Sequence, residues 1–173
     1  MTKDVLYFAK LDSQAIIPTK RDEDGAYDIY IVLDPRETEH EGTVYEKLIR
    51  KGEVTLLDTG IASAMSDSYA LTLKSERSSV GKHGLVVLSG LIDSGYRGSI
   101  MAQVVALEKD ILISSEVDET EVYDDIVIYP YKKALLQARL VVVPDVEVKE
   151  IKYLELIDMP SLRGTGGWGS SGK

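Results

Sequence analysis

Residues 71–74 are Leu-Thr-Leu-Lys, an apolar–polar alternation with a period of two. This pattern predicts a β-strand with one buried face, because successive side chains of a strand point to opposite faces of its sheet. Other short runs rich in Val, Ile, Leu and Tyr also predict strands. The expected strands lie within residues 27–33, 54–57, 70–74, 85–88, 100–107, 126–129 and 136–143.

Turn sequences separate these runs, among them Asp34-Pro35, Arg50-Lys51-Gly52 and Ser94-Gly95. Many short strands joined by turns favour an all-β sandwich, barrel or jelly roll. One short helix is expected near Val44–Ile49, where the apolar residues could follow a helical spacing. No internal repeat and no interdomain linker interrupts the pattern.

Composition excludes several classes of protein. The chain has 173 residues and a net charge of -9, which disfavours binding to a nucleic-acid polymer or an anionic membrane. It has no Cys, which removes disulfides, Cys-bound zinc, iron–sulfur clusters and thiol nucleophiles. The two His, His40 and His83, are too few for a multi-His metal site. Without a long apolar run or a signal-peptide pattern, we expect a soluble cytoplasmic protein that does not enter a membrane.

Two segments differ from the rest in composition. Residues 108–125 contain eight acidic residues and one Lys, and predict a solvated hairpin or loop. Residues 163–173 are rich in Gly and contain Arg163 and the single Trp, Trp168. Composition alone favours a flexible tail there. Its backbone N–H groups, its Arg and its hydroxyls also suit a phosphate clamp that forms when ligand binds.

Two further segments carry polar groups suited to chemistry. Arg77-Ser78-Ser79 places one guanidinium before two hydroxyls, a common sequence in turns and weak evidence by itself. Residues 90–98, Gly-Leu-Ile-Asp-Ser-Gly-Tyr-Arg-Gly, predict a β-hairpin with its turn at Ser94-Gly95. Asp93 and Tyr96 on opposite sides of such a turn could face one cavity.

The order of these segments resembles the trimeric dUTPase family, and the resemblance covers nearly the whole chain. Each segment is a weak or moderate signal alone, but five in the right order make a strong one. The matching segments are Gly25-Ala26-Tyr27-Asp28-Ile29-Tyr30, Arg77-Ser78-Ser79, residues 90–98, Leu135-Leu136-Gln137 and residues 163–172, with Trp168 in place of the usual Phe.

The resemblance implies a fold, an assembly and a reaction. It implies a jelly-roll-like, β-clip fold in a homotrimer, with three sites at subunit boundaries. The β domain would span residues 1–160, and the C-terminal arm residues 161–173. The reaction would be dUTP and water to dUMP and pyrophosphate, with Mg²⁺ bound mainly to the triphosphate.

By the same resemblance, Asp93 would activate the attacking water and Gln137 would help to hold that water. Tyr96 would lie under the deoxyribose and exclude a 2′-hydroxyl. Asp28 would support the network of phosphate, metal and water from behind, and so would contact Mg²⁺ only through water. The substrate-binding residues would be Arg77, Ser78 and Ser79 on the phosphates, Gly90, Leu91 and Ile92 on the uracil edge, and Arg163, Gly167, Trp168, Gly169 and Ser170 in the arm.

Two of the departures from the family pattern concern the partner of Asp28 and the acidic segment. The fourth segment usually has a basic residue three positions before Gln137, but Ala134 stands there, which leaves the partner of Asp28 open; Arg139 could substitute. The acidic residues 108–125 form an insertion, reminiscent of phage dUTPases, where a regulatory protein could bind.

Two alternatives to a dUTPase remain at this stage. One is a dCTP deaminase of the same superfamily, although the Asp93 and Tyr96 pair favours dUTP. The other is a dUTP-binding regulatory protein that acts through the acidic segment.

Overall fold

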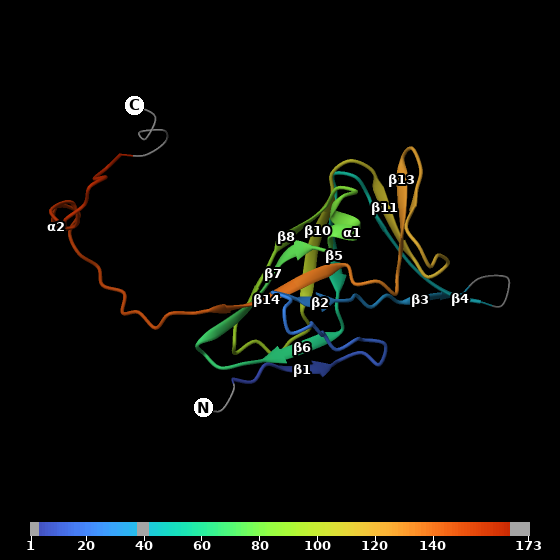
Figure 1. The fold of residues 1–173 in the computed structure, drawn as a ribbon, viewed down its shortest axis with the longest axis horizontal. Coiled ribbons are helices and arrows are strands. Elements are labelled where there is room, and N and C mark those ends of the chain that lie inside the picture. The colour runs from blue at the N-terminus through green and yellow to red at the C-terminus, as the bar shows by residue number, and fades with distance from the viewer. Residues whose placement is uncertain (1–3, 38–41, 167–173) are drawn as a thin grey trace. The chain divides into compact units, whose positions relative to one another are not determined.

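Figure 1 shows a computed structural model of the chain, which describes residues 4–37 and 42–166. The chain divides into two compact units, Met1–Val143 and Pro144–Lys173. The first unit holds every strand found in the described residues. These are β1 (Tyr7–Lys10), β2 (Tyr27–Ile29), β3 (Pro35–Glu37), β4 (Thr43–Ile49), β5 (Val54–Asp58), β6 (Ile61–Ala64), β7 (Tyr69–Glu76), β8 (Leu85–Ser89), β9 (Leu91–Ile92), β10 (Met101–Ala106), β11 (Asp110–Ser114), β12 (Glu121–Val122), β13 (Ile126–Pro130) and β14 (Leu136–Val142).

Both helices of the described chain are short. Helix α1 (Ser78–Gly81) follows β7 directly, and α2 (Tyr153–Ile157) lies in the second unit. In residues 4–37 and 42–166, no helix has the length and apolar character needed to cross a membrane.

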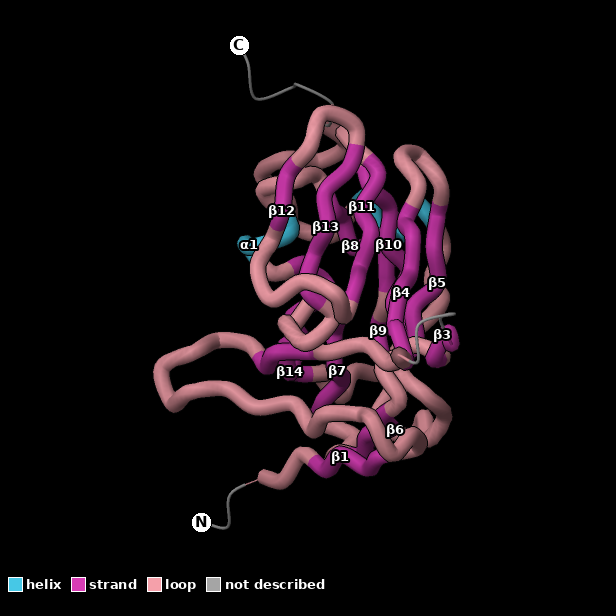
Figure 2. The backbone as a smooth tube through the Cα atoms, turned by 90° about the vertical axis from the view of Figure 1, so that its right-hand side faces the viewer, coloured by secondary structure: helices cyan, strands magenta, loops and turns pink. Residues whose placement is uncertain are grey.

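The strands form four small sheets. Their orders are β1-β6, β5-β10-β8, β12-β13-β11-β4-β3 and β2-β14-β7-β9. In Figure 2, β13, β11 and β4 run side by side at one end of the first unit, and β14 and β7 lie nearer the other end. This agrees with the predicted all-β class, and the expected strands are found, although the strand expected over residues 27–33 is confined to β2.

One hydrophobic core joins the sheets. Buried side chains come from all four, for example Ile61 of β6, Leu71 of β7, Leu85 of β8 and Ile111 of β11. These residues pack in a single cluster, so the strands of the first unit share one interior. The candidate site lies where β7 is followed by α1, next to the residues that precede β14.

The helix expected near Val44–Ile49 is wrong. These residues belong to β4, which pairs with β3 on one side and with β11 on the other. Its β-branched residues fit a pleated surface. Pairing with β3 and with the distant strand β11 decides the conformation here, because a six-residue window also allows a helical spacing.

The prediction of a solvated hairpin or loop for the whole of residues 108–125 is also wrong. Strand β11 lies in the middle of the five-stranded sheet, and Ile111 and Ile113 are fully buried. Residues 116–125 do form an acidic surface, with six exposed carboxylate side chains (Glu116, Asp118, Glu119, Glu121, Asp124 and Asp125). Strand β11 is therefore part of the core, and only the residues after it could act as a surface insertion.

The hairpin predicted for residues 90–98 is only half correct. The turn at Ser94-Gly95 forms, and the N–H of Tyr96 donates to the carbonyl of Asp93 at 3.1 Å. The strand before it, β9, pairs with β7 rather than with the residues after the turn. The segment is thus a loop between two sheets, since β10 pairs with β5 and β8.

Candidate active site

Three segments far apart in the sequence meet beside the end of β7. Asp28 of β2 lies opposite Gln137 of β14, and Gln137 lies opposite Ser75 of β7. The N–H of Arg77 donates to the carbonyl of Leu135 at 2.9 Å, and the N–H of Leu135 donates to the carbonyl of Ile29 at 3.0 Å. Backbone hydrogen bonds therefore hold the first, second and fourth predicted segments together.

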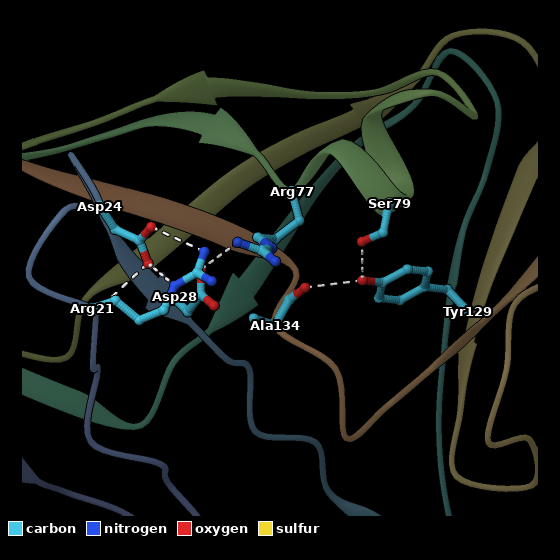
Figure 3. A network of polar contacts seen from close by, with 7 residues as sticks. All are labelled: Arg21, Asp24, Asp28, Arg77, Ser79, Tyr129 and Ala134. Carbon is cyan, nitrogen blue, oxygen red and sulfur yellow. Dashed lines mark hydrogen bonds and ion pairs between the residues drawn. The ribbon is translucent and has the colours of Figure 1, made fainter.

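Asp28 has a cationic partner, and it is Arg77. The Nη1 group of Arg77 donates to Oδ1 of Asp28 at 2.7 Å, with 37% and 31% of the two side chains exposed (Figure 3). This settles the question left by Ala134. The suggestion that Arg139 replaces the missing basic residue as the partner of Asp28 is not supported, because Arg77 fills that place.

A cationic cavity of about 310 Å³ opens beside this pair. Its lining residues are Arg21, Asp24, Gly25, Ala26, Arg77, Gln137 and Arg139. The Nε and Nη2 groups of Arg21 hold the carboxylate of Asp24 at 3.0 and 3.1 Å. This hydrogen bond and the charge of Arg21 lower the pKa of Asp24, so its carboxylate stays ionised. Three guanidinium groups against one carboxylate make the cavity suitable for a polyanion.

On the other side of Arg77 lies a polar cavity of about 400 Å³. Asp28, Tyr30, Arg77, Ser79, Tyr129, Lys132, Lys133 and Ala134 line it. The hydroxyl of Tyr129 donates to the carbonyl of Ala134 at 2.9 Å and lies 2.8 Å from the Ser79 hydroxyl. Burial raises the pKa of Tyr129, which keeps this hydroxyl protonated.

Ser78 and Ser79 differ in their surroundings. Ser78 begins α1 and is exposed, whereas Ser79 is half-buried and is bonded to Tyr129. Sequence reasoning placed both hydroxyls on the phosphates. The Ser79 hydroxyl already has a protein partner.

A third cavity, of about 290 Å³, lies in the loop after β9. Its walls are Gly90, Leu91, Ile92, Asp93, Tyr96, Ser99, Ile100 and Met101. Asp93 is exposed at its edge, while Ile92 packs into the core and anchors the loop. Asp93 and Tyr96 therefore share one cavity, together with backbone that can form hydrogen bonds.

Gly98 allows the position of Tyr96. The Tyr96 ring lies against Gly98, where an added Cβ atom would overlap the ring, and its hydroxyl donates to the Ser99 carbonyl at 3.0 Å. The Nη1 group of Arg97 donates to the carbonyls of Ser94 and Tyr96 at 2.5 and 2.9 Å, which holds the turn closed. The loop thus presents a partly exposed aromatic face at the cavity.

Known proteins resemble this chain in sequence and in fold. The dUTPase family model matches residues 12–116. The deoxyuridine 5'-triphosphate nucleotidohydrolase of Nautilia profundicola is 30% identical over 97% of this chain and 99% of the relative. That of Clostridium acetobutylicum is 31% identical over 96% of each chain.

This chain belongs to the dUTPase family. Solved structures share its fold. The dUTPase of Staphylococcus bacteriophage 80alpha with dUPNHPP has a TM-score of 0.71 and 21% identity, covering 98% of this chain and 99% of that one. A mutant dUTPase of phage phi11 of S. aureus, described as coordinating a structural Mg(II) ion, has a TM-score of 0.63 and 21% identity over 87% of this chain and 99% of that one.

Residues of the segments that resemble the dUTPase family line two of the cavities. The cavity of Asp93 and Tyr96 and the cavity of Arg77 and Gln137 have no lining residue in common. Within this chain, the two groups of residues therefore line different cavities.

The carboxylates of this dUTPase do not form a metal cage in the part of the chain that the structure describes, where no three His, Asp or Glu side chains are grouped closely enough to hold an ion. The carboxylate of Asp28 is engaged by Arg77. The donor set fits Mg²⁺ only as an ion bound mainly by substrate oxygens and water, which is common for this metal.

The dUTPase arm is described as far as residue 166. Within it, Nε of Arg163 donates to the carbonyl of Gly166 at 2.6 Å. Gly167, Trp168, Gly169 and Ser170, which sequence analysis placed on the substrate, lie outside the described residues. Their roles and that of Arg163 stay predictions.

Sequence analysis missed Arg21, Asp24 and Tyr129. The Arg-x-x-Asp spacing of Arg21 and Asp24 is a usable signal for a local ion pair. Tyr129 lies in an apolar strand, and nothing in its sequence context points to a residue fifty positions away.

Proposed function

We propose that this chain is a dUTP diphosphatase, which hydrolyses dUTP to dUMP and pyrophosphate. One observation carries the proposal: a cationic cavity holds Arg77 and Gln137, and a separate cavity holds Asp93 and Tyr96. The first suits a triphosphate and the second a deoxynucleoside. Membership in the dUTPase family supports this assignment.

In the proposed reaction, a water held by Gln137 attacks the α-phosphorus while Asp93 accepts its proton. The bond from the α-phosphorus to the bridging oxygen breaks, and pyrophosphate leaves with that oxygen. Arg77 neutralises charge on the phosphates, and Asp28 fixes its guanidinium. Mg²⁺, carried by the triphosphate, would supply further charge neutralisation. Such hydrolysis depends on positioning and charge more than on covalent chemistry.

The decisive experiment is a panel of deoxynucleoside triphosphates with Mg²⁺ or with EDTA. We expect pyrophosphate from dUTP but not from dTTP or dCTP, and little with EDTA. Asp93→Asn should abolish turnover, while Asp67→Asn, which changes an exposed turn carboxylate, should not. Full activity of Asp93→Asn would refute the mechanism. Ammonia release from dCTP would instead indicate a deaminase.

We also propose that the active enzyme is a homotrimer, acting in the cytoplasm of its cell or host. The Asp93 cavity and the Arg77 cavity have no lining residue in common, which supports a site shared between copies. Mixing tests this: Asp93→Asn and Arg77→Ala chains, each inactive alone, should regain activity when refolded together, because some shared sites combine an intact half from each. Light scattering should give the mass of three chains. A monomeric mass, or no recovery of activity, would contradict it.

A regulatory protein could bind the acidic surface of residues 116–125, and we propose a basic partner there. Among the solved relatives, phage 80alpha dUTPases are described as controlling transfer of virulence genes by a G protein-like mechanism. Deleting residues 108–125 would also remove β11, which belongs to the core, and so would not isolate the effect of the acidic surface. Changing the six exposed carboxylates to amides should preserve dUTP hydrolysis and lose a protein that the unchanged chain retains from host extract. Identical retained proteins would argue against the proposal.

A further inference from the structure

The hydroxyl of Tyr129 connects two segments of the proposed phosphate site. Tyr129 lies on β13 in the five-stranded sheet, with 1% of its surface exposed. Its hydroxyl lies 2.8 Å from that of Ser79 in α1 and 2.9 Å from the carbonyl oxygen of Ala134, just before β14 (Figure 3). A buried side chain of another sheet thus links the residues after Arg77 to those before Gln137.

The direction of these hydrogen bonds can be worked out from the groups themselves. The carbonyl of Ala134 can only accept, so the single proton of Tyr129 goes to it. The oxygen of Tyr129 must then accept, and the Ser79 hydroxyl donates to it. The proton of Ser79 is therefore not available to a phosphate oxygen. Ser79 serves the protein, although its position in the sequence suggested direct binding of substrate.

The link lies parallel to a second connection between the same segments. The backbone N–H of Arg77 donates to the carbonyl of Leu135, next to Ala134. Two hydrogen-bonded paths, one through backbone and one through Tyr129, therefore hold the start of α1 against residues 134–135. Arg77 forms the first path through its own N–H, and its guanidinium reaches Asp28 (Figure 3). Without the path through Tyr129, only the backbone hydrogen bond to Leu135 would hold the start of α1 against residues 134–135.

From this geometry we infer that Tyr129 is a positioning residue, which fixes Arg77 for phosphate binding through Ser79 and α1. The expected effect of Tyr129 on catalysis rests on the proposed function, whereas its expected effect on anion binding does not. This role of Tyr129 also accounts for Ala134 at a position where the family usually has a basic side chain. The backbone carbonyl of Ala134 accepts the hydrogen bond from Tyr129, so no functional side chain is needed there.

The test compares Tyr129→Phe with Tyr131→Phe. Tyr131 is a nearby control: it is partly buried, whereas Tyr129 is fully buried, and its hydroxyl accepts one hydrogen bond, from the N–H of Leu33, but it lines none of the three site cavities. Tyr129→Phe should lower kcat/KM for dUTP by about 2- to 13-fold, the range of one neutral hydrogen bond. Tyr131→Phe should leave it unchanged at temperatures well below the Tm of both variants.

Inhibition by two separate fragments distinguishes positioning from a general loss of stability. Tyr129→Phe should weaken inhibition by pyrophosphate by a similar factor and leave inhibition by deoxyuridine unchanged, because only the phosphate half is affected. Ser79→Ala should show the same losses as Tyr129→Phe, and Ser79→Thr, which keeps a hydroxyl, should keep the activity. The double variant Tyr129→Phe with Ser79→Ala should lose little more than either single variant, because both changes remove the same link.

These outcomes separate this inference from the proposed function. If the unchanged protein does not hydrolyse dUTP, the proposed function fails, while pyrophosphate binding measured by calorimetry still tests Tyr129. Equal losses in Tyr129→Phe and Tyr131→Phe, or unchanged pyrophosphate binding in Tyr129→Phe, would overturn the inference. If Tyr129→Phe does not fold, Ser79→Ala decides by the same measurements.

Discussion

Replacing Arg139 with glutamine is expected to weaken triphosphate binding. Arg139 lies on β14 two residues after Gln137, and both line the cationic cavity. Arg21 is paired with Asp24 and Arg77 with Asp28. Among the described residues of this cavity, Arg139 is the guanidinium that has no ion pair, so it contributes most of the uncompensated positive charge.

The size of the effect follows from that position. A hydrogen bond to a charged group contributes about 1.5–3 kcal/mol. Because Arg139 is exposed to solvent, we take the lower end, about 1.5 kcal/mol, which corresponds to roughly tenfold in kcat/KM. Salt should reduce the difference, since exposed charges are screened over about 10 Å at 0.1 M ionic strength.

The assay is steady-state pyrophosphate release from dUTP at 50 mM and 500 mM NaCl. Arg139→Gln should lose about tenfold in kcat/KM at low salt and less at high salt, and Arg139→Lys should fall between it and the unchanged protein. Arg50→Gln, which removes an exposed charge after β4, is the matched control. The reasoning is refuted if Arg139→Gln and Arg50→Gln have the same kinetics at both salt concentrations.

Three other perturbations follow from the same structure. Asp28→Ala removes the half-exposed ion pair to Arg77, and should lower the free energy of unfolding by about 0.5–1 kcal/mol in urea titrations; an unchanged urea midpoint would contradict this. Gly98→Ala should displace the Tyr96 ring and reduce the preference for dUTP over UTP by about tenfold in kcat/KM, with an unaltered preference as the contrary result. Burial and two neighbouring lysines lower the pKa of His83 in the folded chain. The folded chain therefore favours neutral His83, and this adds stability above pH of about 6.5, the usual pKa of His in an unfolded chain. That stability is lost as the pH falls through the lower pKa of the folded chain. His83→Gln should therefore reduce the difference in unfolding free energy between pH 8 and pH 5, and an equal difference would count against this.

Local sequence patterns predicted the strands that bury one face and the strands that bury both faces. Residues 70–74 alternate, and residues 100–107 are mostly apolar, so each indicates a strand without knowledge of its partners. Strands β4 and β11 could not be predicted in this way. Each pairs with the other, and Asp110 and Lys109 give the start of β11 the composition of a loop. Tertiary pairing outweighs local preference in such strands.

For the candidate site, the sequence identified the residues better than their partners. Asp28, Arg77 and Gln137 were named from their segments, and the structure brings these segments together. Sequence reasoning could not find the partner of Asp28, because the pairing depends on a side chain 49 positions away. It also assigned the Ser79 hydroxyl to substrate, because Tyr129 becomes a neighbour of Ser79 only when the sheets pack together.

The net charge of -9 gives a poor indication of what this chain binds. Most of the acidic excess lies in residues 108–125, whose exposed part forms one surface after β11. The cavity of Arg77 and Arg139 has the opposite character, because its single carboxylate is already paired with Arg21. Since exposed charges more than about 10 Å apart are largely screened at physiological ionic strength, a ligand at this cavity interacts mainly with the local arginines. The charge that decides binding is therefore set by which carboxylates are paired at the site, and this is a property of the fold rather than of the composition.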